Sequence, residues 1–169
     1  GGLRHRMPLT AAAFTIGALA LAGIPPLSAF WSKDEILLAI RDGLNPIYLV
    51  AFLAAIVLSA LYMARATRLA FYGPMSDEAR KAPESPGVMT TPLLILAVLS
   101  VFSGLLALPW TASYDGFGSF LFLAEHGPHG FELVVQGTIA SALLAGGGFA
   151  TGWWLYDRRA DLVESISKR

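Results

Sequence analysis

Cysteine is absent from this 169-residue sequence, and charged residues make up only 14% of it. Without cysteine the chain cannot form disulfides, thiolate zinc sites or thiolate-ligated iron–sulfur clusters, and it has no thiol redox chemistry. Scarce charge together with 55% hydrophobic residues indicates a membrane protein. We therefore expect the lipid bilayer as its surroundings and no nucleic acid as a partner.

Basic residues are missing from one long connector, residues 109–130, and this absence predicts the orientation of the chain. Translocated loops carry few Lys and Arg, whereas cytoplasmic loops are rich in them. With 109–130 as an outer loop and 73–89 as a cytoplasmic loop, only Arg41 falls on the outer side and Lys33 stays unassigned. The other basic residues then lie on or near the cytoplasmic side: Arg4, Arg6, Arg65, Arg68, Arg80, Lys81, Arg158, Arg159, Lys168 and Arg169. The pattern predicts that both ends of the chain lie inside.

Four apolar segments predict an all-α integral membrane fold, because a spanning helix needs about 20 residues. They cover, approximately, residues 9–40, 46–72, 90–108 and 131–156. Asn45 can cap a helix that begins at Pro46, and Pro92 suits a first helical turn. The opening residues lack a starting Met, so we expect residues 1–169 to be a single membrane fragment of a longer chain.

The first apolar segment is too long for one straight span. Residues 9–40 as a single helix would measure about 48 Å, against a hydrocarbon core of about 30 Å. Its centre holds the sequence GIPP, which comprises Gly23, Ile24, Pro25 and Pro26. The prolines remove two backbone donors and push the preceding residue toward an extended conformation, while the glycine can end a helix. We predict an interruption within residues 22–27, with its freed carbonyls facing protein or a water-filled cavity.

Three charged residues, Lys33, Asp34 and Glu35, follow this predicted break. One interpretation is structural: Ser32 caps a helix, Glu35 returns to the cap, and Lys33 extends to the membrane interface as an anchor. The other makes Lys33 a proton carrier, because burial and a neighbouring carboxylate change its affinity for a proton in opposite directions. The two interpretations do not exclude each other.

Four stretches follow one another along the chain: GGLRHRMPLT, GALALAGIPPLSAFWSKDEIL, ALYMARATRLAFYG and PESPGVMTTPLLILAVLSVFSG. In this order they resemble consecutive signatures of the antiporter-like L subunits of respiratory complex I, NADH:quinone oxidoreductase, which implies that the chain is part of a larger antiporter-like helix bundle. The resemblance implies that Lys33 belongs to a proton path opening to the outer side, with Asp34 and Glu35 as its acidic neighbours. Arg65 matches a family arginine, although an anchoring role is the alternative for it. Pro83 stands where the family commonly has a histidine, which puts that histidine's role in loop contacts in doubt.

The function implied by this resemblance is proton translocation coupled to electron transfer from NADH to quinone. NADH, FMN, the iron–sulfur clusters and quinone would be bound by partner subunits, and this chain would hold no cofactor. Its partners would be other membrane subunits, including neighbouring antiporter-like ones, in a bacterial inner membrane. A subunit of a multisubunit sodium/proton antiporter or of a membrane-bound hydrogenase is an alternative, and a structural scaffold is a third.

Two further patterns carry smaller expectations. His126 and His129 have a spacing that suits a metal ion, but no further ligand accompanies them, so we expect an outer loop and no metal. Gly148 and Gly152 form a small-xxx-small face, which predicts close packing of the last helix against another.

Overall fold

The computed structural model of this chain describes residues 1–43, 45–106 and 131–158. Within these ranges every regular element is a helix, which confirms the predicted all-α class. The elements are η1 (Leu3–His5), α1 (Pro8–Ala22), α2 (Ser28–Gly43), α3 (Pro46–Thr67), η2 (Arg68–Tyr72), α4 (Asp77–Lys81), α5 (Gly87–Leu106) and α7 (Phe131–Arg158). The element η2 is a π-helix that continues α3 without interruption.

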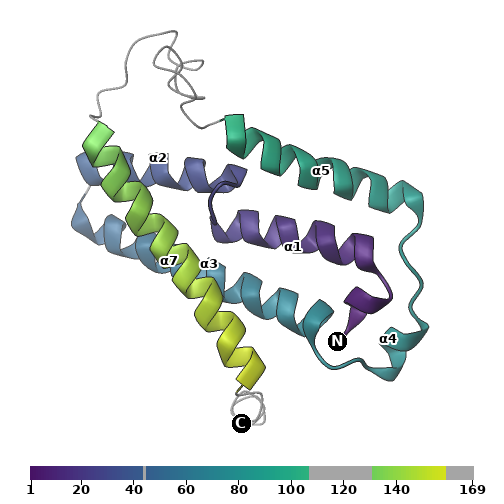
Figure 1. Cartoon of the computed structure of the whole chain (residues 1–169). Helices are drawn as coiled ribbons and strands as arrows, with labels where there is room; N and C mark the ends of the chain where they lie inside the picture. The colour runs from purple at the N-terminus through teal and green to yellow at the C-terminus, as the bar shows by residue number, and fades with distance from the viewer. Residues whose placement is uncertain (44, 107–130, 159–169) are drawn as a thin grey trace.

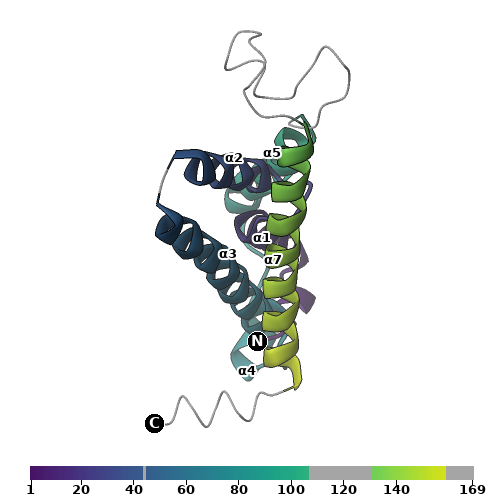
Figure 2. The same cartoon turned by 90° about the vertical axis from the view of Figure 1, so that its left-hand side faces the viewer.

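The helices run back and forth across the molecule (Figure 1). α1 and α2 follow one another in the same overall direction, α3 returns beside them, and α5 runs alongside α1. α7 crosses α3 obliquely and packs chiefly against it. Figure 2 shows α7 along one side of the bundle with α3 slanting away from it. α2, which follows the junction with α1, packs against α3, α5 and α7.

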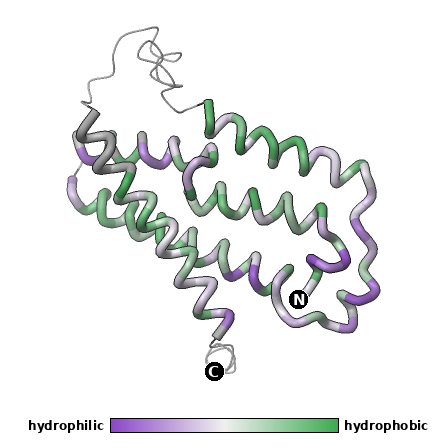
Figure 3. Tube along the Cα trace, in the orientation of Figure 1, coloured by the Kyte–Doolittle hydropathy of each residue, from purple (hydrophilic) through white to green (hydrophobic). Residues whose placement is uncertain are grey.

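Two of the described helices are long and apolar enough to cross a membrane: Pro46–Tyr72 and Gly87–Leu106. Pro8–Ala22 is apolar but shorter. Large apolar side chains on these helices stay exposed, for example Val50 at 66% and Val88 at 86%, as expected for surfaces that meet lipid. Figure 3 shows apolar residues along the helices and hydrophilic ones at the N-terminal segment, α4 and the connection to α5. The predicted count of four spans and their orientation remain predictions.

Two helix starts can be compared with their sequence signals. Asn45 caps α3 as predicted, since its Oδ1 accepts a hydrogen bond of 3.1 Å from the backbone N–H of Ile47. The placement of Pro92 in a first turn was wrong, because α5 begins at Gly87 and Pro92 lies inside it. The reason is that the carbonyl of Pro86 accepts the first backbone N–H groups of α5, so the helix is established before the proline.

The predicted small-residue face of α7 is confirmed. A Cβ added at Gly148 would lie 3.1 Å from the Cβ of Ala60, and one at Gly152 would lie 2.9 Å from the Cβ of Ala64. Both alanines belong to α3 and are completely buried. The backbones of the two helices therefore approach closely at two successive turns, which is the packing that small residues allow in membranes.

Replacing Gly152 by alanine is expected to destabilise the chain, because the added methyl group meets Ala64 and the backbone of Leu61. Overpacking of this kind typically costs about 1–3 kcal/mol. Gly147→Ala on the same helix is the matched control, since its added Cβ meets nothing within 4 Å. The unfolding temperature of each purified full-length variant in detergent measures the stability of Gly152→Ala against that of Gly147→Ala. Equal unfolding temperatures for the two variants would contradict this packing.

The segment between η2 and α5 folds back on the start of α1 through Glu84. The Glu84 carboxylate accepts hydrogen bonds from Thr10 Oγ1 (2.7 Å) and from the backbone N–H of Leu9 (3.0 Å). It thereby caps a helix from a position more than seventy residues further along the chain. The bond from Thr10, followed by the backbone bonds, lowers the pKa of Glu84. The neighbouring Pro83 therefore does not prevent the loop from contacting the helix.

Candidate functional site: a lysine at the helix break

α1 ends in a glycine-dependent cap. Gly23 has a φ of 83°, a left-handed conformation that glycine adopts without strain. Its N–H donates to the carbonyl of Ala20, and the N–H of Ile24 donates to the carbonyl of Leu19. This pair of bonds is a Schellman motif, which leaves the carbonyls of the last turn, including that of Leu21, in need of other donors.

α2 begins at Ser28, directly after residues 22–27 and one turn earlier than the interpretation of Ser32 as a cap required. Ser32 therefore lies inside the helix, where its Oγ donates a 3.1 Å hydrogen bond to the carbonyl of Ala29. The interpretation of Ser32 as a cap residue was wrong. The physical reason is that Leu27 already turns the chain, since its carbonyl accepts from the N–H of Phe30.

Lys33 bridges the broken helix and α3. Its Nζ donates to the carbonyl of Leu21 at 2.6 Å and to the Oγ of Ser59 at 3.3 Å. The first contact places an ammonium group at the carboxyl end of α1, where the helix dipole favours positive charge. Gly23 also makes room for this side chain, because a Cβ there would lie 3.0 Å from the Cδ of Lys33.

Asp34 lies on a different side of α2. It is only 4% exposed, and its Oδ1 accepts a 3.3 Å hydrogen bond from the Oγ of Ser141 in α7. Successive residues of a helix point about 100° apart, so the side chains of Lys33 and Asp34 contact different helices. Lys33 and Asp34, both described, are not joined to each other by an ion pair. Glu35 follows on α2, but its side chain lies outside what the structure describes.

Arg65 lies away from Lys33, near the C-terminal end of α3. It is exposed, and its guanidinium group lies 5.4 Å from the ring centroid of Tyr156 in α7. Six residues separate it from Ser59, which corresponds to about 9 Å along the helix axis. Arg68, one turn further, pairs with Asp157. These contacts join the C-terminal end of α3 to the C-terminal end of α7, and the arginines lie beside aromatic rings.

The break itself rests on α5, a contact that the sequence interpretation did not identify. The Oγ atoms of Ser28 and Ser100 lie 3.2 Å apart. One turn further along α5, a Cβ added at Gly104 would lie 1.9 Å from the carbonyl oxygen of Pro26 and 2.9 Å from the Cα of Leu27. The spacing of Ser100 and Gly104 by four residues is a small-xxx-small pattern, and this is the signal that could have indicated the contact.

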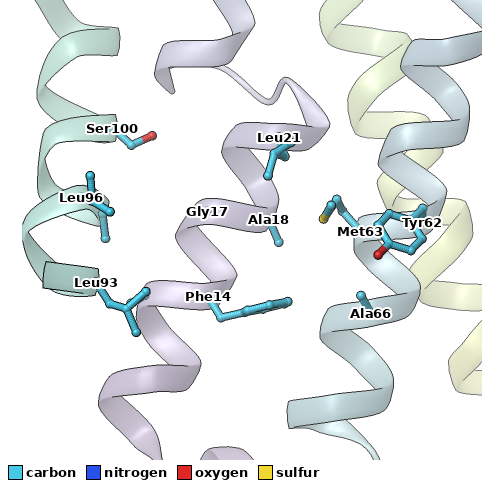
Figure 4. A pocket seen from close by; sticks show the side chains of 12 residues that line it. Phe14, Gly17, Ala18, Leu21, Tyr62, Met63, Ala66, Leu93, Leu96 and Ser100 are labelled. Carbon is cyan, nitrogen blue, oxygen red and sulfur yellow. The ribbon is translucent and has the colours of Figure 1, made fainter. Parts of the chain in front are cut away.

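An apolar groove of about 380 Å³ adjoins this region between α1, α3 and α5 (Figure 4). Figure 4 shows Phe14, Ala18 and Leu21 of α1 between Leu96 of α5 and Met63 of α3. Among the described residues that line the groove there is no carboxylate, lysine or histidine. The charged chemistry of this part of the molecule therefore lies at the break and not in the groove.

Metal ligands do not gather in the described ranges, where no group of three or more His, Asp or Glu side chains is placed to hold a metal ion. His126 and His129 lie outside those ranges.

A helix pair interrupted in this way, with a lysine bonded to a freed carbonyl, is typical of membrane proteins that transport ions. Interrupted helices of this kind form ion sites in transporters, and ionisable residues within spans are rare outside such paths. Residues 1–59 match the family described as "NADH:quinone oxidoreductase/Mrp antiporter, TM".

Individual relatives extend this match along the chain. The chain is 41% identical over 158 residues to NAD(P)H-quinone oxidoreductase chain 5 of Picosynechococcus sp., which covers 79% of this chain and 23% of that protein. It is 33% identical over 177 residues to NADH-quinone oxidoreductase subunit L of Rickettsia bellii, which covers 100% of this chain and 27% of that protein. The chain thus spans about a quarter of the length of these curated relatives. The resemblance found in the sequence is confirmed, and the chain belongs to the antiporter-like membrane subunits of this oxidoreductase family.

Proposed function

We propose that this chain is part of a proton-translocating, multi-pass subunit of an NADH:quinone oxidoreductase in a bacterial inner membrane. The observation that carries the proposal is the position of Lys33, whose ammonium group joins the carboxyl end of α1 to α3 across the helix break. The names of the relatives from Rickettsia and Picosynechococcus support the choice of oxidoreductase. In this proposal the chain crosses the membrane four times, with both ends inside.

Lys33 is the proton carrier in this scheme, and the helix break controls it. Partial burial disfavours the charged ammonium, while the Leu21 carbonyl and the dipole of α1 favour it. A small movement of the end of α1 relative to α2 changes this balance and so loads or releases the proton. Asp34 and Glu35 supply negative charge on the same helix turn, and Arg65 takes a supporting position at the cytoplasmic side.

The electron-transfer chemistry belongs to partner subunits in this proposal. Those subunits would bind NADH, FMN, the iron–sulfur clusters and quinone, and other membrane subunits, including neighbouring antiporter-like ones, would transmit their conformational change to Lys33. The matched family description also names the Mrp antiporter, which supports sodium/proton antiport as the second candidate.

NADH-driven proton translocation and sodium/proton antiport differ in the energy source that moves the protons across the membrane. Inverted membrane vesicles containing the assembled complex are given NADH in sodium-free buffer, and uptake of protons is followed with a pH-sensitive dye. We expect acidification without sodium, and we expect Lys33→Ala to reduce it while NADH oxidation continues. Acidification that depends on a sodium gradient and not on NADH would favour the antiporter instead.

A further inference from the structure

We propose that Ser59 of α3 is a second residue of the proton path, whose hydroxyl group relays the proton between Lys33 and water. The inference rests on the proposed function of Lys33 and adds a residue to it. Neither the sequence motifs nor the family resemblance draws attention to this serine, because it lies in the apolar stretch AAIVLSALYM.

Hydrogen bonding places Ser59 directly beside the ammonium group. Its Oγ accepts from Lys33 Nζ at 3.3 Å and donates to the carbonyl of Ile56 at 2.9 Å. Ser59 is half-buried between the exposed Leu58 and the completely buried Ala60. The hydroxyl thus lies at the edge of the α3 packing surface, where it faces the helix break.

The two groups bonded to Lys33 Nζ have different chemical abilities. The carbonyl of Leu21 is only an acceptor, so it can hold the ammonium proton but cannot pass a proton on. A serine hydroxyl has one donor and two acceptor positions, so Ser59 can accept from Lys33 and donate elsewhere at the same time. The carboxylate of Asp34 contacts α7 instead. Of the described groups bonded to Nζ, Ser59 is therefore the one able to relay.

The relay step conserves atoms and charge. One N–H bond of the Lys33 ammonium breaks as an O–H bond forms on Ser59, and the original O–H bond of Ser59 breaks as its proton passes to a water molecule. Lys33 becomes a neutral amine, and the positive charge leaves as a protonated water in a hydrogen-bonded chain. Before the step, the hydroxyl rotates from the Ile56 carbonyl toward that water. The reverse sequence reloads Lys33.

A matched pair of variants tests the hydroxyl itself. Ser59→Thr and Ser59→Val have nearly the same shape, but only threonine keeps the hydroxyl group. The complete complex in vesicles is assayed for protons pumped per NADH oxidised, with complex content measured separately. We expect Ser59→Thr to pump like the parent and Ser59→Val to lose most of its pumping. Ser103→Ala is the control, because that exposed serine donates to backbone carbonyls of its own helix, those of Leu99 and Ser100, and not to α3 within the described part of the chain.

The outcomes separate this inference from the proposed function. Equal pumping by the threonine and valine variants, with Lys33→Ala defective, would overturn the relay and leave the role of Lys33 intact. Normal pumping by Lys33→Ala would overturn both. Defective pumping by Ser59→Val that threonine restores supports the relay, because a purely structural role depends on shape, which the two variants share.

Discussion

Replacing Lys33 by arginine is expected to reduce NADH-driven proton pumping to well below half of the parent value, while the complex still assembles. A guanidinium group is so strongly basic that it stays protonated in a protein and does not release its proton. It can nevertheless donate to the carbonyl of Leu21 and so retain the contact that now holds α1 to α2. Arginine therefore preserves any anchoring role of this position and removes a carrier role.

The measurement is the dye-reported proton gradient per NADH oxidised in vesicles, with complex content determined on native gels. Lys81→Arg provides the matched control, because Lys81 is an exposed lysine of α4 outside the site. The carrier role is wrong if Lys33→Arg pumps like the parent. In that case the structural interpretation of the charged cluster, an interfacial anchor, accounts for the lysine.

Gly104→Ala is expected to have the second large effect, although Gly104 carries no chemistry of its own. The added Cβ would lie 1.9 Å from the carbonyl oxygen of Pro26 and 2.7 Å from the carbonyl carbon of Leu27. Both are backbone atoms, so no side-chain rotation can relieve the overlap, and α5 must move away from the break. Overpacking costs about 1–3 kcal/mol or more, and here it also displaces the end of α1 that Lys33 contacts.

The loss of stability and the effect of the displaced helix end on pumping can both be measured on one preparation of the complex. We expect a lower unfolding temperature of the purified complex and fewer protons pumped per NADH oxidised. Gly87→Ala on the same helix is the control, since its added Cβ meets nothing within 4 Å. A Gly104→Ala protein with the stability and pumping of the Gly87→Ala protein would show that the break does not depend on its contact with α5.

Local signals in the sequence account for much of the helical architecture. A proline lacks a backbone donor and a glycine can adopt a left-handed φ, and both properties affect only residues nearby in the chain. The end of α1 at Gly23 and the start of α3 at Asn45 therefore depend on the neighbouring residues and not on distant contacts. The apolar segments and the small-residue face of α7 likewise depend on composition and periodicity. Two local assignments were wrong: Ser32 is not the cap of α2, and Pro92 does not lie in the first turn of α5, because carbonyls earlier in the chain, at Leu27 and Pro86, accept the first helical bonds.

What the tertiary structure alone decided is which partners the charged and small residues meet. The sequence places Lys33 and Asp34 side by side, but the helix directs one to α1 and α3 and the other to α7. Ser59 and Gly104 belong to the site only because α3 and α5 pack against the break. Contacts between residues so far apart in the chain depend on how helices pack, and helix periodicity specifies which face is apolar without specifying which helix covers it.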